Sequence, residues 1–313
     1  MCAVKNRDLY RLWRKACLML LLLALLLPCV VAAAETVYSE NEWGYVDAAM
    51  DVSSGIPDDA GGRLGYIRDK GVLRVATEPY YAPQEFIDPS LSGQDQYVGS
   101  DMELARRIAE RMGVELEIVP MDFTRVLDAV AHGDCDLAIS ALSFTPGRAA
   151  RVELSRGYHY SGESAGSGLL IRKENRTRIR SLEHLKDRRI IAQRGSLQES
   201  LLAERVLNYT EFRRVPSVQD IYNALMNREM DAACVDIETT RVFLEHNPRS
   251  RLMLVPDVVF AQEAQYDGDR IAARKGETEL IAFVNGVIGE VTDSGEYENW
   301  FDQYAVLAKD LGL

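Results

Sequence analysis

The sequence predicts an α/β protein made of two doubly wound lobes joined by two hinge strands. Three observations support this fold class. Short apolar strands alternate with amphipathic helices at the spacing of right-handed βαβ units. A second pattern of the same kind begins after residue 160, and the 313 residues, 47% of them hydrophobic, suffice for about two domains. The hinge strands are expected near residues 160–164 and 264–268.

The first 34 residues have the pattern of an export signal. Five basic residues precede the apolar run Cys17–Leu27, and alanines at positions 32–34 form a small-residue cleavage site. Pro28 interrupts the apolar run, which makes it short for a membrane span, although a retained signal anchor is an alternative. Lipidation of Cys29 is a second alternative. We expect an exported protein, in the periplasm or at the outer face of the cytoplasmic membrane.

Residues 35–62 predict an acidic, flexible linker, because they hold seven acidic residues and no Lys or Arg. The first lobe is then expected over residues 63–160 and the second over 161–265. Residues 266–313 are expected to return to the first lobe.

In the first lobe, one helix is predicted especially clearly. Residues 101–112 place their apolar side chains on one face, begin with acids and end at Gly113. We also expect helices over 63–70 and 123–131, and strands over 72–76, 114–118 and 137–142. This order predicts a mostly parallel sheet.

The second lobe repeats the alternation of strands and helices. We expect strands over 169–172, 189–192, 212–215 and 231–235, with helices over 181–187, 195–207 and 218–226. Ser196 and Glu199 have the spacing of a capping box. A last strand over 271–273 and helices over 277–291 and 295–307 complete the chain.

The two lobes share an internal similarity. The segment PMDFTRVLDAVAHGDCD (120–136) and the segment PSVQDIYNALMNREMD (216–231) each run from a proline through an amphipathic helix to an aspartate before a buried strand. Cys135 and Cys234 occupy matching places after these helices. Two buried thiols are therefore expected, with neither a disulfide nor a metal site.

Polar residues are expected at the carboxyl ends of the strands, where doubly wound sheets bind ligands. After the strand at 137–142, Thr145 can cap a new helix that begins at Pro146 and carries Arg148, a suitable seat for an anion. The second lobe presents Asp236 and the helix cap at Ser196. A carboxylate held by Arg148 and an ammonium held by Asp236 would fit a zwitterion. The formal net charge of −12 argues against a nucleic-acid partner.

The chain resembles the family 3 solute-binding proteins of polar amino-acid ABC transporters, over roughly residues 63–308. The segments that carry the resemblance are GVLRVATEPYYAPQEFID (71–88), YVGSDMELARRIAERMGVELEIV (97–119), DLAISALSFTPGR (136–148), AQRGSLQE (192–199), DAACVD (231–236) and RKGETELIAFVNGVI (274–288). The resemblance implies the type II periplasmic binding protein architecture. It also implies an amino-acid ligand without a cofactor, a membrane ABC permease as partner and a monomeric protein.

The family's ligand contacts can be transferred to this sequence position by position. Arg148 resembles the arginine that binds the α-carboxylate, assisted by Thr145 and by the backbone near Ser196 and Leu197, and Asp236 resembles the acceptor of the α-ammonium. Tyr81 and Phe123 resemble the aromatic walls on either side of the ligand side chain, and Ser140, Ser143 and Glu78 lie where polar side-chain contacts are made. Ala141, at the end of the same strand as Ser140, is also expected at the site. Gln84 departs from the family, because an aromatic residue is usual there.

Other functions on the same scaffold remain open from the sequence. A cyclohexadienyl or arogenate dehydratase would need a general acid, for which Glu78 is the cleft candidate. A sensory ligand-binding domain is another alternative. Because of Glu78, we favour a ligand with a basic or amide side chain, bound by a hinged, non-enzymatic protein.

Overall fold

The computed structural model describes residues 38–162, 166–260 and 267–313. The signal peptide expected over 1–34 lies outside these residues. So do residues 163–165 and 261–266, and with them part of each expected hinge strand. Two five-stranded sheets form the centres of two lobes, which confirms the expected fold class.

The sheet of the first lobe has the order β4-β1-β5-β12-β6. Its strands are β1 (Val72–Thr77), β4 (Glu115–Pro120), β5 (Leu137–Ser143), β6 (Val152–Leu154) and β12 (Asp269–Arg274). β1 pairs in parallel with β4 and β5, whereas β12 is antiparallel to β5 and β6. Four of the five strands therefore run in the same direction, as predicted, and β12 opposes them. β12 runs against β5 because the chain re-enters this sheet from the second lobe, at the end where β5 finishes.

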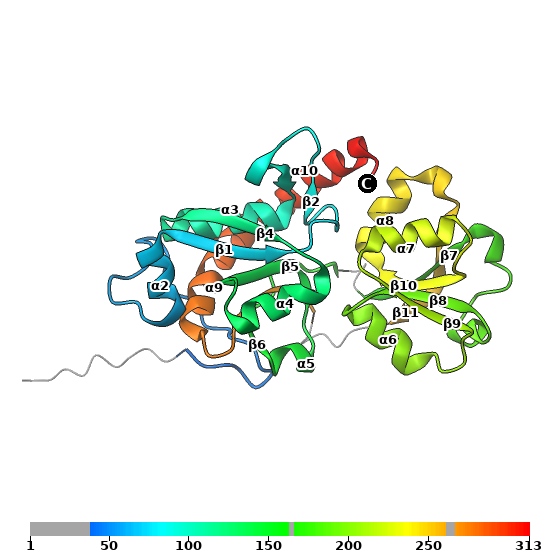
Figure 1. The fold of residues 1–313 in the computed structure, drawn as a ribbon, viewed down its shortest axis with the longest axis horizontal. Helices are drawn as coiled ribbons and strands as arrows, with labels where there is room; N and C mark the ends of the chain where they lie inside the picture. Colours follow the sequence, from blue (N-terminus) through cyan, green and yellow to red (C-terminus); the bar gives the residue numbers. More distant parts are fainter. Residues whose placement is uncertain (1–37, 163–165, 261–266) are drawn as a thin grey trace, which may run out of the picture. The chain divides into compact units, whose positions relative to one another are not determined.

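Helices cover both faces of this sheet (Figure 1). α4 (Phe123–His132) packs on one face, while α2 (Gly62–Lys70), α3 (Ser100–Met112) and α9 (Thr278–Asp293) pack on the other. The single turn α5 (Pro146–Ala149) follows β5. The short pair β2 (Phe86–Ile87) and β3 (Tyr97–Val98), joined through the 3₁₀ turn Gly93–Gln96, packs against α10 (Glu296–Leu311).

The sheet of the second lobe has the order β11-β7-β10-β8-β9. The strands are β7 (Ser167–Arg172), β8 (Arg189–Gln193), β9 (Glu211–Val215), β10 (Ala232–Asp236) and β11 (Leu252–Phe260). The strands β8, β9 and β10 are parallel, and β7 is antiparallel to β10 and β11. α6 (Leu197–Arg205) covers one face, and α7 (Val218–Met226) and α8 (Ile237–His246) cover the other. Short 3₁₀ turns lie at Lys173–Asn175, Leu182–Leu185 and Pro248–Ser250.

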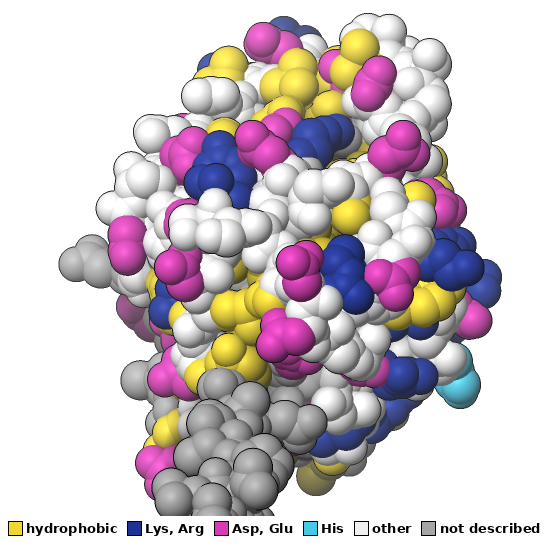
Figure 2. Space-filling model, turned by 90° about the vertical axis from the view of Figure 1, so that its left-hand side faces the viewer, with side chains coloured by type: hydrophobic (Ala, Val, Ile, Leu, Met, Phe, Trp, Pro, Cys, Tyr) yellow, Lys and Arg dark blue, Asp and Glu magenta, His cyan; other side chains and the backbone are white. Residues whose placement is uncertain are grey.

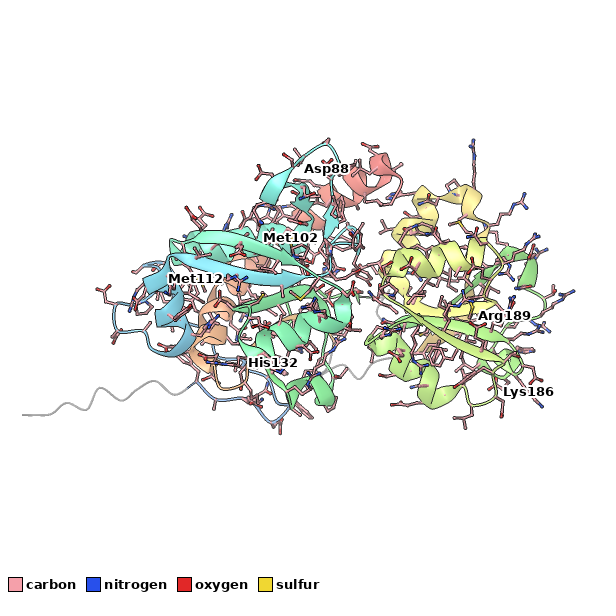
Figure 3. All side chains as sticks on the ribbon, viewed as in Figure 1. Asp88, Met102, Met112, His132, Lys186 and Arg189 are labelled. Carbon is pink, nitrogen blue, oxygen red and sulfur yellow. The ribbon has the colours of Figure 1, made fainter. Side chains whose placement is uncertain are left out.

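The internal similarity corresponds to the same structural device in both lobes. Asp136, before β5, accepts a hydrogen bond from the backbone N–H of Arg74 at 2.7 Å. Asp231, before β10, accepts one from the backbone N–H of Arg189 at 3.0 Å. In each lobe an aspartate thus fastens the amino end of the neighbouring parallel strand. Figure 3 shows Arg189 at the far right of the second lobe and Met112 towards the left of the first.

The expected flexible linker is packed from residue 38 onward, which corrects the prediction for residues 38–62. Val46 is fully buried, and its N–H donates to the Leu154 carbonyl at 2.9 Å. The buried Asn285 side chain donates to the carbonyls of Val46 and Ala48 at 2.7 and 2.9 Å. The acidic composition concealed the few apolar residues, such as Val46 and Val52, that anchor this segment in the core of the first lobe.

The outer surface of the first lobe carries mixed charge. In Figure 2, acidic and basic side chains alternate over the visible described surface without one sign dominating. Oppositely charged side chains of this lobe also form ion pairs, such as Arg107–Glu296 and Arg111–Glu290, at 2.8 and 2.7 Å. None of the helices in the described residues has the length and apolar composition needed to cross a membrane.

Candidate ligand-binding site

A polar cavity is lined by residues of both lobes, and it contains ten of the eleven residues expected to bind the ligand. These are Glu78, Tyr81, Phe123, Ser140, Ala141, Ser143, Arg148, Ser196, Leu197 and Asp236. The first seven come from the first lobe, and the last three come from the second. Both lobes therefore contribute to one site, at the ends of β1, β5, β8 and β10.

Thr145 is the predicted residue that does not line the cavity. Its hydroxyl oxygen accepts a hydrogen bond from the backbone N–H of Arg148 at 3.1 Å, so it caps α5 as the sequence predicted. The capping bond uses one lone pair of the Thr145 hydroxyl oxygen and leaves its O–H available as a donor, so the contact of Thr145 with a ligand stays a prediction.

Arg148 is a buried cation that is held by carbonyl groups. Its Nη1 donates to the Ser143 carbonyl at 2.6 Å, and its Nη2 donates to the Gly195 carbonyl of the second lobe at 3.2 Å. The guanidinium carbon lies 5.6 Å from the centre of the Phe123 ring. Burial lowers the pKa of Arg148 to about 10, so the side chain remains charged at neutral pH. No carboxylate among the described residues forms an ion pair with Arg148, and donors of the guanidinium remain available for an anion.

Asp236 ends β10 and caps α8. Its Oδ1 accepts hydrogen bonds from the backbone N–H of Thr239 at 2.9 Å and from the Thr239 hydroxyl at 3.0 Å. Burial raises the pKa of Asp236 to about 6. The capping role fixes the carboxylate, and its position in the cavity lets it meet a cation there.

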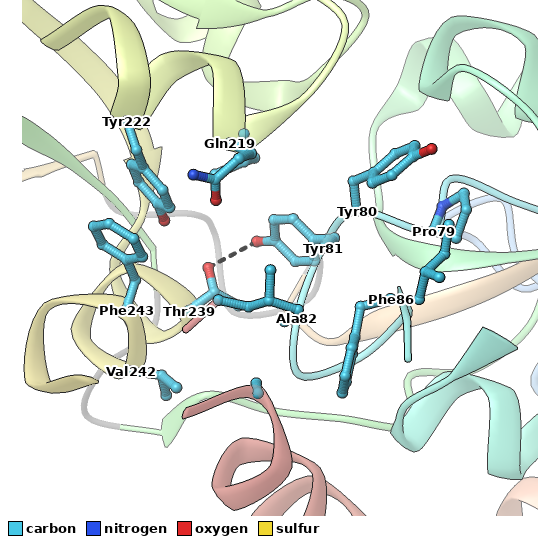
Figure 4. A pocket seen from close by; sticks show the side chains of 14 residues that line it. Pro79, Tyr80, Tyr81, Ala82, Phe86, Gln219, Tyr222, Thr239, Val242 and Phe243 are labelled. Carbon is cyan, nitrogen blue, oxygen red and sulfur yellow. Dashed lines mark hydrogen bonds between the residues drawn. The ribbon is translucent and has the colours of Figure 1, made fainter. Parts of the chain in front are cut away.

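The wall of the cavity includes a hydrogen bond between the lobes. The Tyr81 hydroxyl lies 3.0 Å from the Thr239 hydroxyl oxygen, as Figure 4 shows. Beyond Tyr81 lies a more apolar cavity of about 180 Å³, lined by both lobes. Its lining includes Pro79, Tyr80, Ala82, Phe86, Tyr222 and Phe243. Tyr81 belongs to both cavities and separates the polar one from the apolar one.

Carboxyl groups outnumber basic groups around the polar cavity. Burial raises the pKa of Glu78 to about 8, and the nearby Asp122 acts in the same direction. Glu85 is fully buried and accepts a hydrogen bond from the Ser140 hydroxyl at 2.9 Å. Burial raises the pKa of Glu85 well above its usual range. Asp269, whose pKa burial raises to about 7, accepts a hydrogen bond from the Gln84 amide at 2.7 Å.

An ion pair between His159 of the first lobe and Glu238 of the second connects the lobes beside this cavity. His159 is 4% exposed, and its Nε2 lies 2.8 Å from Glu238 Oε2 in α8. Its ring also stacks on Phe301 at 4.6 Å. Burial opposes the charge of His159, but hydrogen bonds to Glu238 and Glu298 raise its pKa to about 11. The imidazolium therefore persists at neutral pH.

Sequence reasoning did not select several residues that line the cavity. These are Gln84, Glu85, Ser161, Gln193, Gln198, Glu238 and Asp269. Gln84 had been noted only as a departure from the family pattern. Asp269 lies opposite Ser143 in the antiparallel pairing of β12 with β5, and no local sequence signal indicates that register. In the described parts of the chain, no group of three or more His, Cys, Asp or Glu side chains is arranged to hold a metal ion.

Comparison with known proteins identifies the family. The model of the bacterial extracellular solute-binding proteins, family 3, matches residues 73–306. The chain belongs to this family. The resemblance found in the sequence is therefore confirmed.

Among the family 3 relatives is the arginine-binding extracellular protein ArtP of Bacillus subtilis (strain 168). It is 29% identical over 239 residues, which cover 74% of this chain and 87% of ArtP. A probable histidine-binding protein of Campylobacter jejuni is 28% identical, over 74% of this chain and 84% of its own length. The L-cystine-binding protein TcyJ of Escherichia coli (strain K12) is 25% identical, over 77% of this chain and 86% of its own length.

Solved structures of family 3 proteins share the fold. The L-arginine-bound amino acid ABC transporter substrate-binding protein AbpA of Streptococcus pneumoniae is 32% identical, with a TM-score of 0.69 over 77% of this chain and 97% of AbpA. The ancestral amino acid-binding protein AncCDT-1, a precursor of cyclohexadienyl dehydratase, is 25% identical. Its TM-score is 0.66, over 78% of this chain and 99% of its own.

Proposed function

We propose that this protein binds an amino acid with a basic side chain outside the cytoplasm and delivers it to a membrane ABC permease. The α-carboxylate would bind Arg148 and the α-ammonium would bind Asp236, so that the ligand contacts both lobes. Tyr81 and Phe123 would flank its side chain. The serines at 140, 143 and 196 and the backbone at Ala141 and Leu197 would add polar contacts.

The excess of carboxyl groups in the cavity is the observation that carries this proposal. Glu78 lines the cavity together with Asp236, and burial raises its pKa, as do the negative charges of Asp122 and Asp220. A cationic group of the ligand would favour the ionised form of Glu78 and so gain a strong partner. An amide side chain could only hydrogen-bond to this group. We therefore favour arginine, lysine or ornithine over glutamine.

The comparisons support this choice of ligand class. ArtP is named for arginine, and AbpA was solved with L-arginine. The relatives also include histidine- and cystine-binding proteins, so family membership alone does not select one ligand. The names of the relatives describe extracellular and periplasmic proteins, which supports export of this chain from the cytoplasm.

Delivery would depend on rotation of the lobes about their two connections. A ligand that touches both lobes stabilises the closed form by its differential affinity for that form. The permease would then recognise the closed, loaded, monomeric protein. Burial of the ligand's charges is tolerated only because each one meets a partner, since an unpaired buried charge costs several kcal/mol.

A thermal-shift screen of the 20 amino acids and ornithine tests the proposal. At a hundredfold excess over Kd, a ligand stabilises the folded state by about 2.7 kcal/mol. We expect the largest shift in melting temperature from a basic amino acid. A screen in which no amino acid shifts the melting temperature would contradict the proposal.

A dehydratase on this scaffold is the second candidate. The raised pKa of Glu78, about 8, would keep a general acid protonated at neutral pH, as such a reaction requires. AncCDT-1 is an amino acid-binding protein and a precursor of cyclohexadienyl dehydratase, which connects this scaffold with that enzyme. Release of the product from prephenate or arogenate, lost in Glu78→Gln, would favour this candidate over a binding protein without turnover.

A further inference from the structure

Asp269 occupies a fixed position in the lining of the candidate site. It begins β12, and its backbone is held on both sides. Its N–H donates to the His159 carbonyl at 3.0 Å, and its carbonyl accepts from the N–H of Tyr158 at 2.9 Å. The β12–β5 pairing places Asp269 opposite Ser143, a predicted ligand contact. These backbone hydrogen bonds therefore fix the part of the chain from which the Asp269 carboxylate projects.

One oxygen of this carboxylate is occupied, and the other faces no donor. Gln84, only 2% exposed, donates from Nε2 to Asp269 Oδ2 at 2.7 Å. Within the described residues, Asp269 Oδ1 accepts no hydrogen bond and Asp269 forms no ion pair. Asp269 lines the same cavity as Arg148 and Asp236, and also a smaller adjoining cavity that Asp236 shares.

Asp236 shows the same partial occupation. Its Oδ1 receives both hydrogen bonds from Thr239, which leaves Oδ2 without a donor among the described residues. A primary ammonium carries three N–H donors, more than one free carboxylate oxygen can satisfy. Two carboxylates that each offer one free oxygen fit such a group better than one does.

We propose that Asp269 is a second acceptor for the ligand's α-ammonium, acting beside Asp236 and held in place by Gln84. This proposal rests on the proposed amino-acid-binding function and adds a residue to its site. The ammonium would lie between a carboxylate of the second lobe and one of the first. Binding of the ligand's α-ammonium would therefore favour the closed arrangement of the two lobes.

The charged groups around the site agree with this placement. The negative charge of Asp236 contributes to the raised pKa of Asp269, and Asp269 is the carboxylate whose charge acts on the pKa of Arg148. Glu78, in contrast, responds to Asp122 and Asp220. We therefore assign the ligand's α-ammonium to Asp236 and Asp269, and its side chain to the neighbourhood of Glu78.

Two ligands that differ only in the α-ammonium can isolate its contribution to binding. L-Arginine and 5-guanidinopentanoate differ only in that the second lacks the α-ammonium. We would titrate both by calorimetry, the weaker one in competition, into the unaltered protein, Asp269→Asn and Asp267→Asn. Asp267 is the matched control, because it lines the adjoining cavity but not the cavity that contains Arg148. If another amino acid gives the largest thermal shift, that amino acid and its deamino form replace the pair.

We expect Asp269→Asn to weaken arginine binding by about 10- to 100-fold, as for the loss of a hydrogen bond to a charged group. Its affinity for 5-guanidinopentanoate should stay within about twofold, because that ligand never makes the contact. Asp267→Asn should leave both affinities unchanged. Equal losses for both ligands, or no loss for arginine, would overturn the role of Asp269 while leaving the proposed function intact. Failure of the unaltered protein to bind any amino acid would overturn both.

Discussion

The Tyr81 hydroxyl and the Thr239 hydroxyl lie 3.0 Å apart, so the two lobes are hydrogen-bonded to each other beside Asp236. Thr239 in turn donates to Asp236 Oδ1 at 3.0 Å. An aromatic residue of the first lobe is thereby connected to the proposed ammonium acceptor of the second. Tyr81 therefore links the two lobes, in addition to its proposed contact with the ligand side chain.

Removing the Tyr81 hydroxyl should weaken ligand binding while keeping the ring. We expect Tyr81→Phe to lower amino-acid affinity by about 3- to 10-fold, because a typical hydrogen bond that favours the closed form is lost. Isothermal titration calorimetry would measure the change. Tyr80→Phe is the control, since Tyr80 is 58% exposed and should give unchanged affinity. Equal affinities of Tyr81→Phe and the unaltered protein would contradict a role for this bond in closure.

Arg148 should be essential for binding. Arg148→Ala is expected to reduce amino-acid affinity by about 100-fold or more, because the ligand carboxylate would lose its bidentate cationic partner. Arg148→Lys should recover only part of the loss. Fluorescence or calorimetric titration would measure both. Arg151→Ala is the matched control, because Arg151 is nearby in the chain but its side chain is 55% exposed and paired with Asp128. Retained binding in Arg148→Ala would exclude Arg148 as the carboxylate anchor.

The ligand-free protein should become more stable as the pH falls from 8 to about 5. The pKa values of Glu78, Asp269 and Asp236 are raised to about 8, 7 and 6, above those of an unfolded chain. The folded state therefore binds more protons than the unfolded state in this window, and stability rises as these groups are protonated. His159, with a pKa of about 11, acts in the same direction above pH 6.5.

Urea unfolding of the ligand-free protein at pH 5.5 and pH 8 would measure this dependence. Asp269→Asn should reduce the difference between the two pH values, because one titrating group is removed. Ligand binding should show the opposite trend, since the cationic groups of the ligand need ionised acceptors: affinity should fall as the pH drops through the pKa values of Glu78, Asp269 and Asp236, about 8, 7 and 6. Stability that increased from pH 5.5 to pH 8 would contradict the raised pKa values.

The ion pair between His159 and Glu238 should stabilise the contact between the lobes. Glu238→Gln is expected to lower the free energy of unfolding by about 1–3 kcal/mol, because a buried imidazolium loses a charged partner. The pKa of His159 should fall, which NMR titration of its ring can follow. Glu298→Gln is the comparison, since Glu298 also contacts His159 but its side chain is 62% exposed. A larger loss of unfolding free energy in Glu298→Gln than in Glu238→Gln would contradict the prediction that Glu238, in the other lobe, is the stronger partner of His159.

The segment that precedes α2 should depend on Asn285. Asn285→Ala removes the donors to the Val46 and Ala48 carbonyls and the acceptor for the backbone N–H of Arg156, at 3.0 Å. We expect a loss of about 2–3 kcal/mol in unfolding free energy from these unsatisfied buried groups. Limited proteolysis within residues 38–60 should become faster. Asn299→Ala, at an exposed position of α10, should change neither.

Local sequence signals were sufficient to predict most elements. The helix expected over 218–226 is observed as Val218–Met226, and the one over 101–112 differs by a single residue at its start. Ser196 caps α6 by accepting from the N–H of Glu199 at 3.0 Å, but Glu199 accepts from the N–H of Gly195 rather than that of Ser196. Periodicity and capping chemistry act over a few residues, which is why they are visible in a sequence.

Features that depend on distant pairing could not be predicted in this way. Asp269 reaches the cavity only through the register of β12 against β5, and Glu85 through its hydrogen bond to Ser140, 55 residues away. His159 meets Glu238 only because two lobes approach each other. Arg148 and Asp236 were found because each closes a strand with its own recognisable local pattern, and the linker was misjudged because its contacts lie in α9 and β6.

The chain order of the two sheets has a consequence for biosynthesis. All strands of the second lobe precede β12, whereas the first lobe needs β12, α9 and α10 to complete its sheet and core. As the chain emerges from its amino end, the second lobe can complete its sheet while the edge of β5 that pairs with β12 is still unpaired. A nascent or truncated chain that stops before residue 269 would therefore expose an unpaired edge of β5, which is prone to aggregation. The first lobe, although it begins the chain, would be the last part to acquire its native structure.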